Sequence, residues 1–149
     1  MSLSNASETA LALLLFQNVA MANIGNSGGL QPSTSAGYFY IALHTQNPTS
    51  SGTQSSYEAA YTGYARVAVA RSSAGWIIAG NQPTSISNAA VVTFPVSNGN
   101  PETETYFSIG TASVGAGQIL ISGALTTPVY VSVGITPIFA IGSIVTTLT

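Results

Sequence analysis

Few residues of this sequence could take part in catalysis. Nucleophilic catalysis by serine needs a base beside the hydroxyl and a third group that orients the base. The sequence contains one histidine, His44, and no aspartate, so a triad would have to use Glu58, Glu102 or Glu104. No Gly-x-Ser-x-Gly segment is present. We therefore expect His44 at the rim of a strand, bonded to a neighbouring backbone group, and we predict no catalytic residues and no enzyme.

Glu102 and Glu104 are the acidic pair with the most suggestive spacing. A separation of two residues places both carboxylates on one face of a strand, and glycoside hydrolases use two carboxylates. Here the pair lies in the turn-like segment NGNPETET. No second acidic cluster is present that would make one carboxyl group the general acid and the other the general base. We interpret this segment as a solvated loop.

Metal and cofactor sites are predicted to be absent. One histidine without cysteine or aspartate offers too few ligands for zinc, and no oxygen-rich calcium loop is visible. The glycine-rich stretches at 27–29 and 115–117 lack the flanking strand, helix and lysine of a phosphate-binding loop. We interpret both stretches as turns.

The chain is almost uncharged. Its 149 residues include two arginines and four glutamates, which give a formal net charge of −2. A nucleic acid partner is not expected, because binding it needs a basic surface. Twenty serines and seventeen threonines supply polarity in place of charge. A surface of this kind repels its neighbours weakly and favours a protein that packs against other proteins.

The N-terminal apolar run is too short to span a membrane. It extends from Leu11 to Phe16 and is ended by Gln17 and Asn18, whereas a span needs about 20 apolar residues. No lysine or arginine precedes Arg66, so the positively charged start of a secretory signal is missing. We expect neither a membrane span nor a signal peptide.

The same segment has the pattern of a helix. Asn5 is predicted as the N-cap, with Glu8 three residues later as in a capping box, and the helix is expected to end near residues 23–25. Its apolar residues cover more than one stripe, so two sides need a partner. Docking on another subunit and burial within its own domain both fit this pattern. The helix residues that we assign to a partner interface are Leu13, Phe16 and Val19.

Tyrosine and arginine side chains gather between residues 57 and 76. These residue types are common energetic anchors of protein interfaces. Each arginine is expected to meet a glutamate, or a carboxylate or carbonyl of a partner. The alternative is that the tyrosines and Trp76 fill the interior. The interface residues predicted from this cluster are Tyr57, Tyr61, Tyr64, Arg66 and Arg71.

From residue 38 onward the sequence predicts short strands separated by turn residues. These strands are 38–44, 64–70, 76–79, 91–94, 105–109, 118–121, 129–133 and 144–147. About eight short strands without crossover helices are typical of an antiparallel sandwich or jelly roll. We predict an all-β, jelly-roll-like antiparallel β-sandwich over 38–149, with an N-terminal helix or arm over 1–24 and a Gly/Ser/Pro-rich connector over 25–37.

Four stretches carry a recognisable order of motifs. They are YFYIALHTQNPTSSGTQ (38–54), YTGYARVAVARSSAGW (61–76), NAAVVTFP (88–95) and FSIGTASVGAGQILISGALTTPVYVSVGITPIFAIGSI (107–144). This order resembles a family of small virion proteins of tailed bacteriophages, often labelled tail fibre proteins and similar to capsid cement or decoration proteins. One departure is Asn47, where the family usually carries an aspartate before the proline, so this turn lacks a charge.

The resemblance implies a non-enzymatic structural role in the virion, assembled in the cytoplasm of the bacterial host. The first expectation is a capsid cement or decoration protein that bridges subunits of the major capsid protein and forms a homodimer or homotrimer. The alternative is a tail, baseplate or fibre component that binds a host receptor or glycan. From the residues alone, Tyr38, Tyr40 and the tyrosines between 57 and 64 also fit the stacking platforms of a carbohydrate-binding module.

Overall fold

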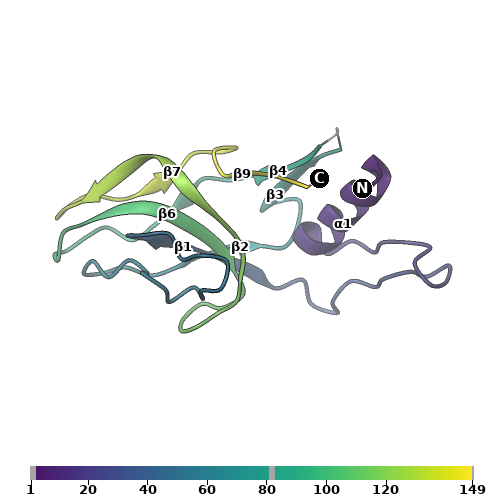
Figure 1. Cartoon of the computed structure of the whole chain (residues 1–149), viewed down its shortest axis with the longest axis horizontal. Coiled ribbons are helices and arrows are strands. Elements are labelled where there is room, and N and C mark those ends of the chain that lie inside the picture. The colour runs from purple at the N-terminus through teal and green to yellow at the C-terminus, as the bar shows by residue number, and fades with distance from the viewer. Residues whose placement is uncertain (1–2, 81–82, 149) are drawn as a thin grey trace. The chain divides into compact units, whose positions relative to one another are not determined.

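A computed structural model describes residues 3–80 and 83–148 of the chain (Figure 1). It contains the helix α1 (Asn5–Gln17) and the strands β1 (Tyr38–His44), β2 (Val67–Ala70), β3 (Trp76–Ala79), β4 (Thr84–Asn88), β5 (Val92–Thr93), β6 (Glu102–Gly110), β7 (Ile119–Val131), β8 (Ile138–Phe139) and β9 (Val145–Leu148). The pairings β1–β6, β3–β4, β4–β9 and β6–β7 are antiparallel. The predicted fold class, all-β with antiparallel sheets and one N-terminal helix, is confirmed.

Several strand boundaries differ from the prediction. The strand expected over 64–70 begins only at Val67, and the strands expected over 118–121 and 129–133 are parts of one long strand, β7. The strand β4 was not predicted, because its buried face carries Thr84 and Asn88 beside Ile86, and polar side chains hide the apolar alternation. The two-residue strand β8 is too short to produce a pattern.

The helix also differs from the prediction at both ends. Its N-cap is Ser4 rather than Asn5, and the Ser4 Oγ accepts a hydrogen bond from the N–H of Ser7 at 3.3 Å. The helix ends at Gln17, because Asn18 adopts a left-handed conformation with a φ of 58° and directs its N–H to the carbonyl of Leu13. Asparagine tolerates this conformation better than most residues. The chain therefore leaves the helix well before residues 23–25.

The chain divides into two compact units. Unit 1 contains residues 1–37, 70–92 and 139–149, and unit 2 contains residues 38–69 and 93–138. The short strands β5 and β8 pair with each other in a two-stranded sheet. The division into an arm over 1–24, a connector over 25–37 and one domain over 38–149 stays a prediction.

Unit 1 packs α1 against a three-stranded sheet with the order β3-β4-β9. The helix buries one stripe at four-residue spacing, formed by Glu8, Ala12 and Phe16. The ring of Phe16 meets the ring of Trp76 edge-on, with 5.0 Å between the ring centroids. The alternative that Trp76 fills the interior is thus confirmed, whereas Leu15 on the helix stays exposed.

Unit 2 is built on a four-stranded sheet with the order β2-β1-β6-β7. Side chains alternate along β1, so Phe39, Ile41 and Leu43 share one face and His44 points to the opposite face. The loop of residues 45–58 folds back over the face that carries His44. The buried apolar core of the unit contains Phe39, Ile41, Leu43, Ala59, Tyr61, Phe94, Ile109 and Val131.

Candidate functional site

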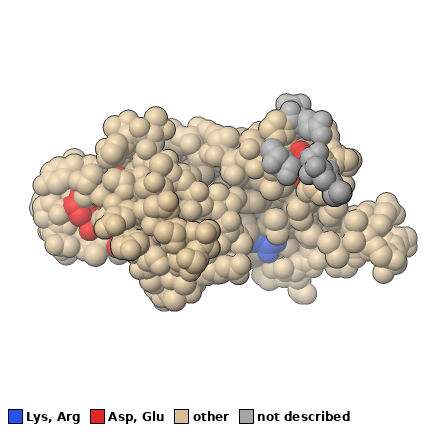
Figure 2. All heavy atoms as spheres, in the orientation of Figure 1, with Lys and Arg blue, Asp and Glu red and all other residues tan. Residues whose placement is uncertain are grey.

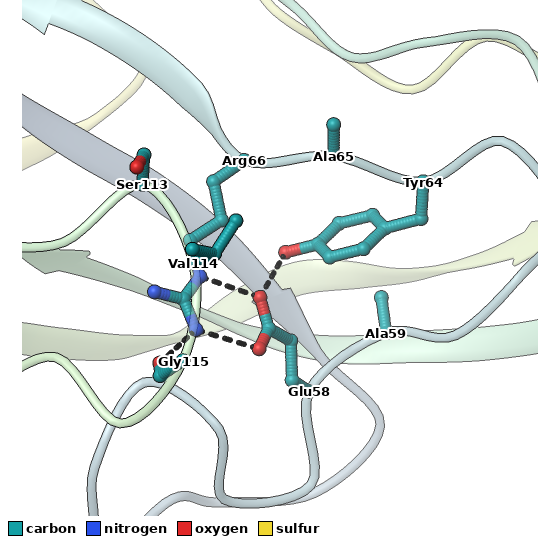
Figure 3. Close-up of a pocket in the computed structure, with 8 residues that line it drawn as sticks. All are labelled: Glu58, Ala59, Tyr64, Ala65, Arg66, Ser113, Val114 and Gly115. Atoms are coloured by element: carbon teal, nitrogen blue, oxygen red, sulfur yellow. Dashed lines mark hydrogen bonds and ion pairs between the residues drawn. The ribbon is translucent and has the colours of Figure 1, made fainter.

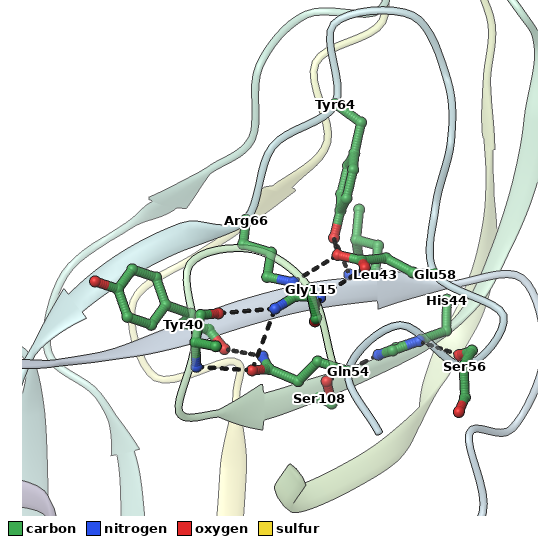
Figure 4. Close-up of polar contacts among 11 residues, drawn as sticks. Tyr40, Leu43, His44, Gln54, Ser56, Glu58, Tyr64, Arg66, Ser108 and Gly115 are labelled. Atoms are coloured by element: carbon green, nitrogen blue, oxygen red, sulfur yellow. Dashed lines mark hydrogen bonds and ion pairs between the residues drawn. The ribbon is translucent and has the colours of Figure 1, made fainter. Parts of the chain in front are cut away.

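His44 is a buried residue of unit 2, so its predicted place at the rim of a strand is wrong. The Nδ1 atom lies 2.8 Å from the carbonyl oxygen of Ser56, and the Nε2 atom lies 2.8 Å from Oγ of Ser108 (Figure 4). A carbonyl only accepts, so Nδ1 carries the proton and Nε2 accepts from the Ser108 hydroxyl. The predicted bond to a neighbouring backbone group is present, but the loop that supplies it also covers the ring.

Burial lowers the pKa of His44, although the bond to the Ser56 carbonyl acts in the opposite direction. The ring is therefore neutral at pH 7. A neutral imidazole that accepts from a serine hydroxyl is the arrangement that activates a serine nucleophile. Here His44 and Ser108 are both fully buried, and their contact joins β1 to β6, while the bond from Nδ1 to Ser56 holds the loop of residues 45–58 to β1.

Gln54 joins three segments of unit 2. Its Nε2 donates to the carbonyl of Tyr40 at 3.0 Å, its Oε1 accepts from the N–H of Ala112 at 3.0 Å, and its backbone N–H donates to the carbonyl of Gly117 at 2.8 Å. The side chain is fully buried, and a Cβ at Gly110 or Gly117 would overlap it. Sequence reasoning missed this residue, because a single glutamine in a loop carries no motif.

Arg66 and Glu58 form a two-pronged ion pair (Figures 3 and 4). The distances are 2.6 Å from Nε to Oε1 and 2.7 Å from Nη2 to Oε2. The guanidinium also donates to the carbonyls of Ala112 at 2.8 Å and Gly115 at 2.6 Å, and its hydrogen bond with Glu58 raises the pKa of Arg66. The predicted contact of this arginine with a glutamate is confirmed, and it fixes the loop of residues 111–117.

Tyr64 and Tyr61 are structural residues of the same unit. The Tyr64 hydroxyl donates to Oε1 of Glu58 at 3.1 Å and accepts from the N–H of Leu43 at 3.2 Å. Burial and the charge of Glu58 raise the pKa of Tyr64. The Tyr61 hydroxyl donates to the carbonyl of Pro95 at 3.0 Å, and burial raises the pKa of Tyr61 to about 12. Both phenols therefore stay protonated at physiological pH.

A pocket of about 230 Å³ opens beside the ion pair (Figure 3). Val114 projects from the loop of residues 111–117 at its edge and is 80% exposed. The carboxylate and guanidinium in the pocket already bind each other, so its walls are neutral overall. The lining residues are Glu58, Ala59, Tyr64, Ala65, Arg66, Ser113, Val114 and Gly115.

Glu102 and Glu104 lie at the start of β6 and not in the predicted solvated loop. The Oε1 atom of Glu102 accepts from the N–H groups of Ala60 at 2.5 Å and Tyr61 at 2.6 Å. Glu104 is fully buried, and neither of its carboxyl oxygens has a hydrogen-bond partner among the described residues. Burial, together with the nearby carboxylate of Glu102, raises the pKa of Glu104 to about 8. Glu104 is therefore mostly protonated at pH 7.

The predicted interface residues divide between the two units. Leu13, Phe16, Val19 and Arg71 belong to unit 1, and Tyr57, Tyr61, Tyr64 and Arg66 belong to unit 2. Phe16 and Tyr61 are buried in the cores of their units, whereas Val19 and Tyr57 are exposed. Arg71 donates to the carbonyls of residues 14, 15 and 36. The interface itself stays a prediction, with Val19 and Tyr57 as its accessible members.

The described residues hold no assembled metal site. Within 3–80 and 83–148, no group of three or more His, Cys, Asp or Glu side chains is placed to bind a metal ion. In the same part of the chain, no helix has the length and apolar character to cross a membrane.

The charged side chains are engaged inside the protein rather than displayed on it. Beyond the contacts above, the buried Glu8 accepts a hydrogen bond from the N–H of Thr84 at 3.1 Å. On the face drawn in Figure 2, charged atoms form only a few isolated spots in a neutral surface. Large apolar side chains are exposed in both units, with Ile141 in unit 1 and Val133 in unit 2 among them. The exterior therefore combines low charge with exposed apolar groups.

This fold and exterior fit a structural protein of a bacteriophage virion, and a family model of such proteins matches residues 2–147. The chain belongs to this family, whose description is podophage GP4 fiber I protein gp80. The resemblance to phage virion proteins labelled as tail fibre proteins is thereby confirmed, and the protein is located in the virion. No curated protein matches the chain significantly.

Proposed function

We propose that the protein is a non-enzymatic structural subunit of a fibre on a podophage virion. The family match over residues 2–147 carries this proposal. The neutral exterior supports it, because exposed apolar groups such as Val133 and Ile141 favour burial against neighbouring proteins. Each Å² of buried apolar surface contributes about 25 cal/mol before the cost of association. Where many copies are present, the modest free energies contributed by the individual contacts add up.

The expected partners are proteins of the particle and further copies of the chain, not nucleic acid or membrane. A capsid cement role, in which dimers or trimers bridge subunits of the major capsid protein, needs the same kind of surface. The two roles differ in location and copy number, because a cement protein follows the capsid lattice and a fibre subunit follows the symmetry of the tail.

Immunogold labelling of purified virions with an antibody against this chain tests the proposal. Label on fibres, with a copy number that is a small multiple of the tail symmetry, supports a fibre subunit. Label spread over the shell, with a copy number comparable to that of the capsid protein, would establish the cement role instead. Particles that carry no label would overturn both.

Tyr57 favours a second role, contact with a host glycan. It exposes 53% of its surface and adopts a φ of 53°, a conformation that bulky residues rarely take. The carbonyl of Tyr57 is held by the N–H of Thr45 at 2.9 Å, and strained residues held in this way are enriched at functional sites.

A glycan array tests this second role. Saturable binding that is lost on Tyr57→Ala and kept on Tyr57→Trp supports a stacking contact. No binding by the unmodified protein, or equal binding by all three forms, would exclude a glycan contact at this residue.

A further inference from the structure

The pocket beside the ion pair has no part in the proposed fibre role. It is bounded by residues 58–59, residues 64–66 and the loop of residues 111–117 (Figure 3). All of these segments lie within unit 2, so one compact unit forms the whole pocket. Its volume of about 230 Å³ is below the range of about 300–1,000 Å³ that is usual for sites of drug-sized ligands. The pocket therefore suits a ligand with a single small ring.

The ion pair in the pocket does not favour a charged ligand. The N–H donors of Arg66 are directed to Glu58, Gln54 and the carbonyls of Ala112 and Gly115, so none is left for an anion such as phosphate. The carboxylate of Glu58 is held by the guanidinium at both oxygens, 2.6 Å and 2.7 Å away. A cationic ligand therefore finds no net negative charge, and the ligand that fits is neutral.

Two polar groups in the pocket wall keep hydrogen-bonding capacity. The Oε2 atom of Glu58 accepts one hydrogen bond among the described residues, from Nη2 of Arg66, although a carboxylate oxygen accepts two. The hydroxyl of Ser113, an exposed residue, has no partner within 3–80 and 83–148. A wholly apolar ligand would strip both groups of water without replacing it, which is unfavourable. A ligand with hydroxyl groups satisfies both.

The remaining wall is largely apolar. The side chains of Ala59, Ala65 and Val114 line the pocket together with Tyr64, whose hydroxyl is already bonded to Glu58. Alkyl groups pack against C–H groups and offer no hydrogen bonds, whereas a few polar groups fix the orientation of a ligand. A pyranose ring carries hydroxyl groups around its rim and C–H groups on its faces, so it matches both parts of the wall.

We propose that this pocket binds one neutral sugar ring of a host glycan. The Oε2 atom of Glu58 and the hydroxyl of Ser113 bind hydroxyl groups of the sugar, and Ala65 and Val114 pack against its C–H groups. The proposed sugar contact rests on the role in glycan contact given above. It adds a second position on unit 2, because Tyr57 does not line the pocket.

Saturation-transfer difference NMR on the purified chain tests the ligand class. The probes are the methyl glycosides of glucose, galactose, mannose and N-acetylglucosamine, and at least one is expected to bind saturably. The matching uronic acid, with a carboxylate in place of the C6 hydroxymethyl group, should bind several-fold more weakly, because Arg66 has no donor left for it. Equal or tighter binding of the uronic acid would contradict a neutral site.

Substitutions in the wall test the location. Ala65→Phe fills the pocket without touching the ion pair and should weaken sugar binding at least tenfold, and Ser113→Ala removes one hydrogen bond and should weaken it about fivefold. The matched control is Ala68→Phe, at an exposed position of β2 outside the pocket, which should bind as the unmodified protein does. Circular dichroism spectra should coincide for all forms, since these three positions are exposed.

Two results would overturn the proposal. One is the absence of binding by all four methyl glycosides, and the other is equal binding by Ala65→Phe and the unmodified protein. If Tyr57→Ala abolished binding while Ala65→Phe kept it, the glycan contact would belong to Tyr57 and not to the pocket. None of these results would change the virion location, which depends on the family match over residues 2–147.

Discussion

At the scale of single residues, this chain uses its rare polar groups as internal ties. Arg66 directs all five of its N–H donors at acceptors within unit 2, on Glu58, Gln54 and two carbonyls of the loop of residues 111–117. Only 2% of its side chain is exposed. A buried guanidinium with complete hydrogen bonding stabilises the segments that it joins, whereas an incomplete set is costly.

Arg66→Lys tests this role. Lysine keeps the charge but cannot make the two-pronged contact with Glu58 or reach two carbonyls at once, so we expect a loss of about 2 kcal/mol in the free energy of unfolding. Urea denaturation measures the change. Ser113→Ala, an exposed substitution in the same pocket wall, serves as the control and should change stability little. Similar stabilities for Arg66→Lys and the unmodified protein would contradict the assigned role.

Glu104 predicts a dependence of stability on pH. Its pKa rises from 4.5 to about 8 in the folded chain, so the folded protein holds a proton that the unfolded chain releases above pH 4.5. The contribution of Glu104 to the free energy of unfolding should therefore fall as pH rises between about 4.5 and 8, at no more than about 1.4 kcal/mol per pH unit, and level off above pH 8.

Thermal unfolding over this pH range measures the effect, with Glu104→Gln as the matched variant. Glutamine has nearly the same shape and does not titrate, so the slope contributed by residue 104 should disappear. An unchanged slope in Glu104→Gln would show that another group is responsible.

At the scale of elements, the periodic features were predictable and the buried polar ones were not. Apolar alternation located β1, a short apolar run between turn residues located β3, and the leucine-rich segment located α1. β4 was missed because Thr84 and Asn88 occupy its buried positions. His44 and Gln54 were misjudged or missed for a related reason: the loop of residues 45–58 folds back over the sheet, and local sequence does not encode that contact.

The loop of residues 111–117 allows a test of such a contact. A Cβ at Gly117 would overlap the amide of Gln54 and the side chain of Ala112, so Gly117→Ala should cost about 2 kcal/mol of stability. Hydrogen exchange of the amides in this loop should become faster.

A double-mutant cycle provides the control. Gln54→Ala removes the overlapping amide, so Gly117→Ala should cost clearly less in that background than in the unmodified protein. Equal costs in both backgrounds would show that the glycine is required for another reason.

At the scale of the whole molecule, the scarcity of free charge sets how the protein responds to its surroundings. Salt screens exposed charges over about 10 Å at 0.1 M ionic strength, but it affects buried pairs much less. The ion pair between Arg66 and Glu58 is largely buried, and Glu104 is fully buried. The surface therefore offers few interactions for salt to weaken.

Self-association should accordingly change little between low and high sodium chloride concentration. Sedimentation velocity of the purified chain at both concentrations measures this, and ammonium sulfate, which strengthens apolar burial, should promote association. Dissociation on adding sodium chloride would indicate that ionic contacts hold the copies together.

The interleaving of the two units along the chain has a consequence for biosynthesis. The sheet that receives the N-terminal helix is completed by β9, which is translated after every strand of unit 2. Unit 1 can reach its full set of strand pairings only after residues 145–148 have been translated and have left the ribosome. A nonsense codon shortly before residue 145 would therefore spare every strand of unit 2 and still leave β4 without one of its neighbours.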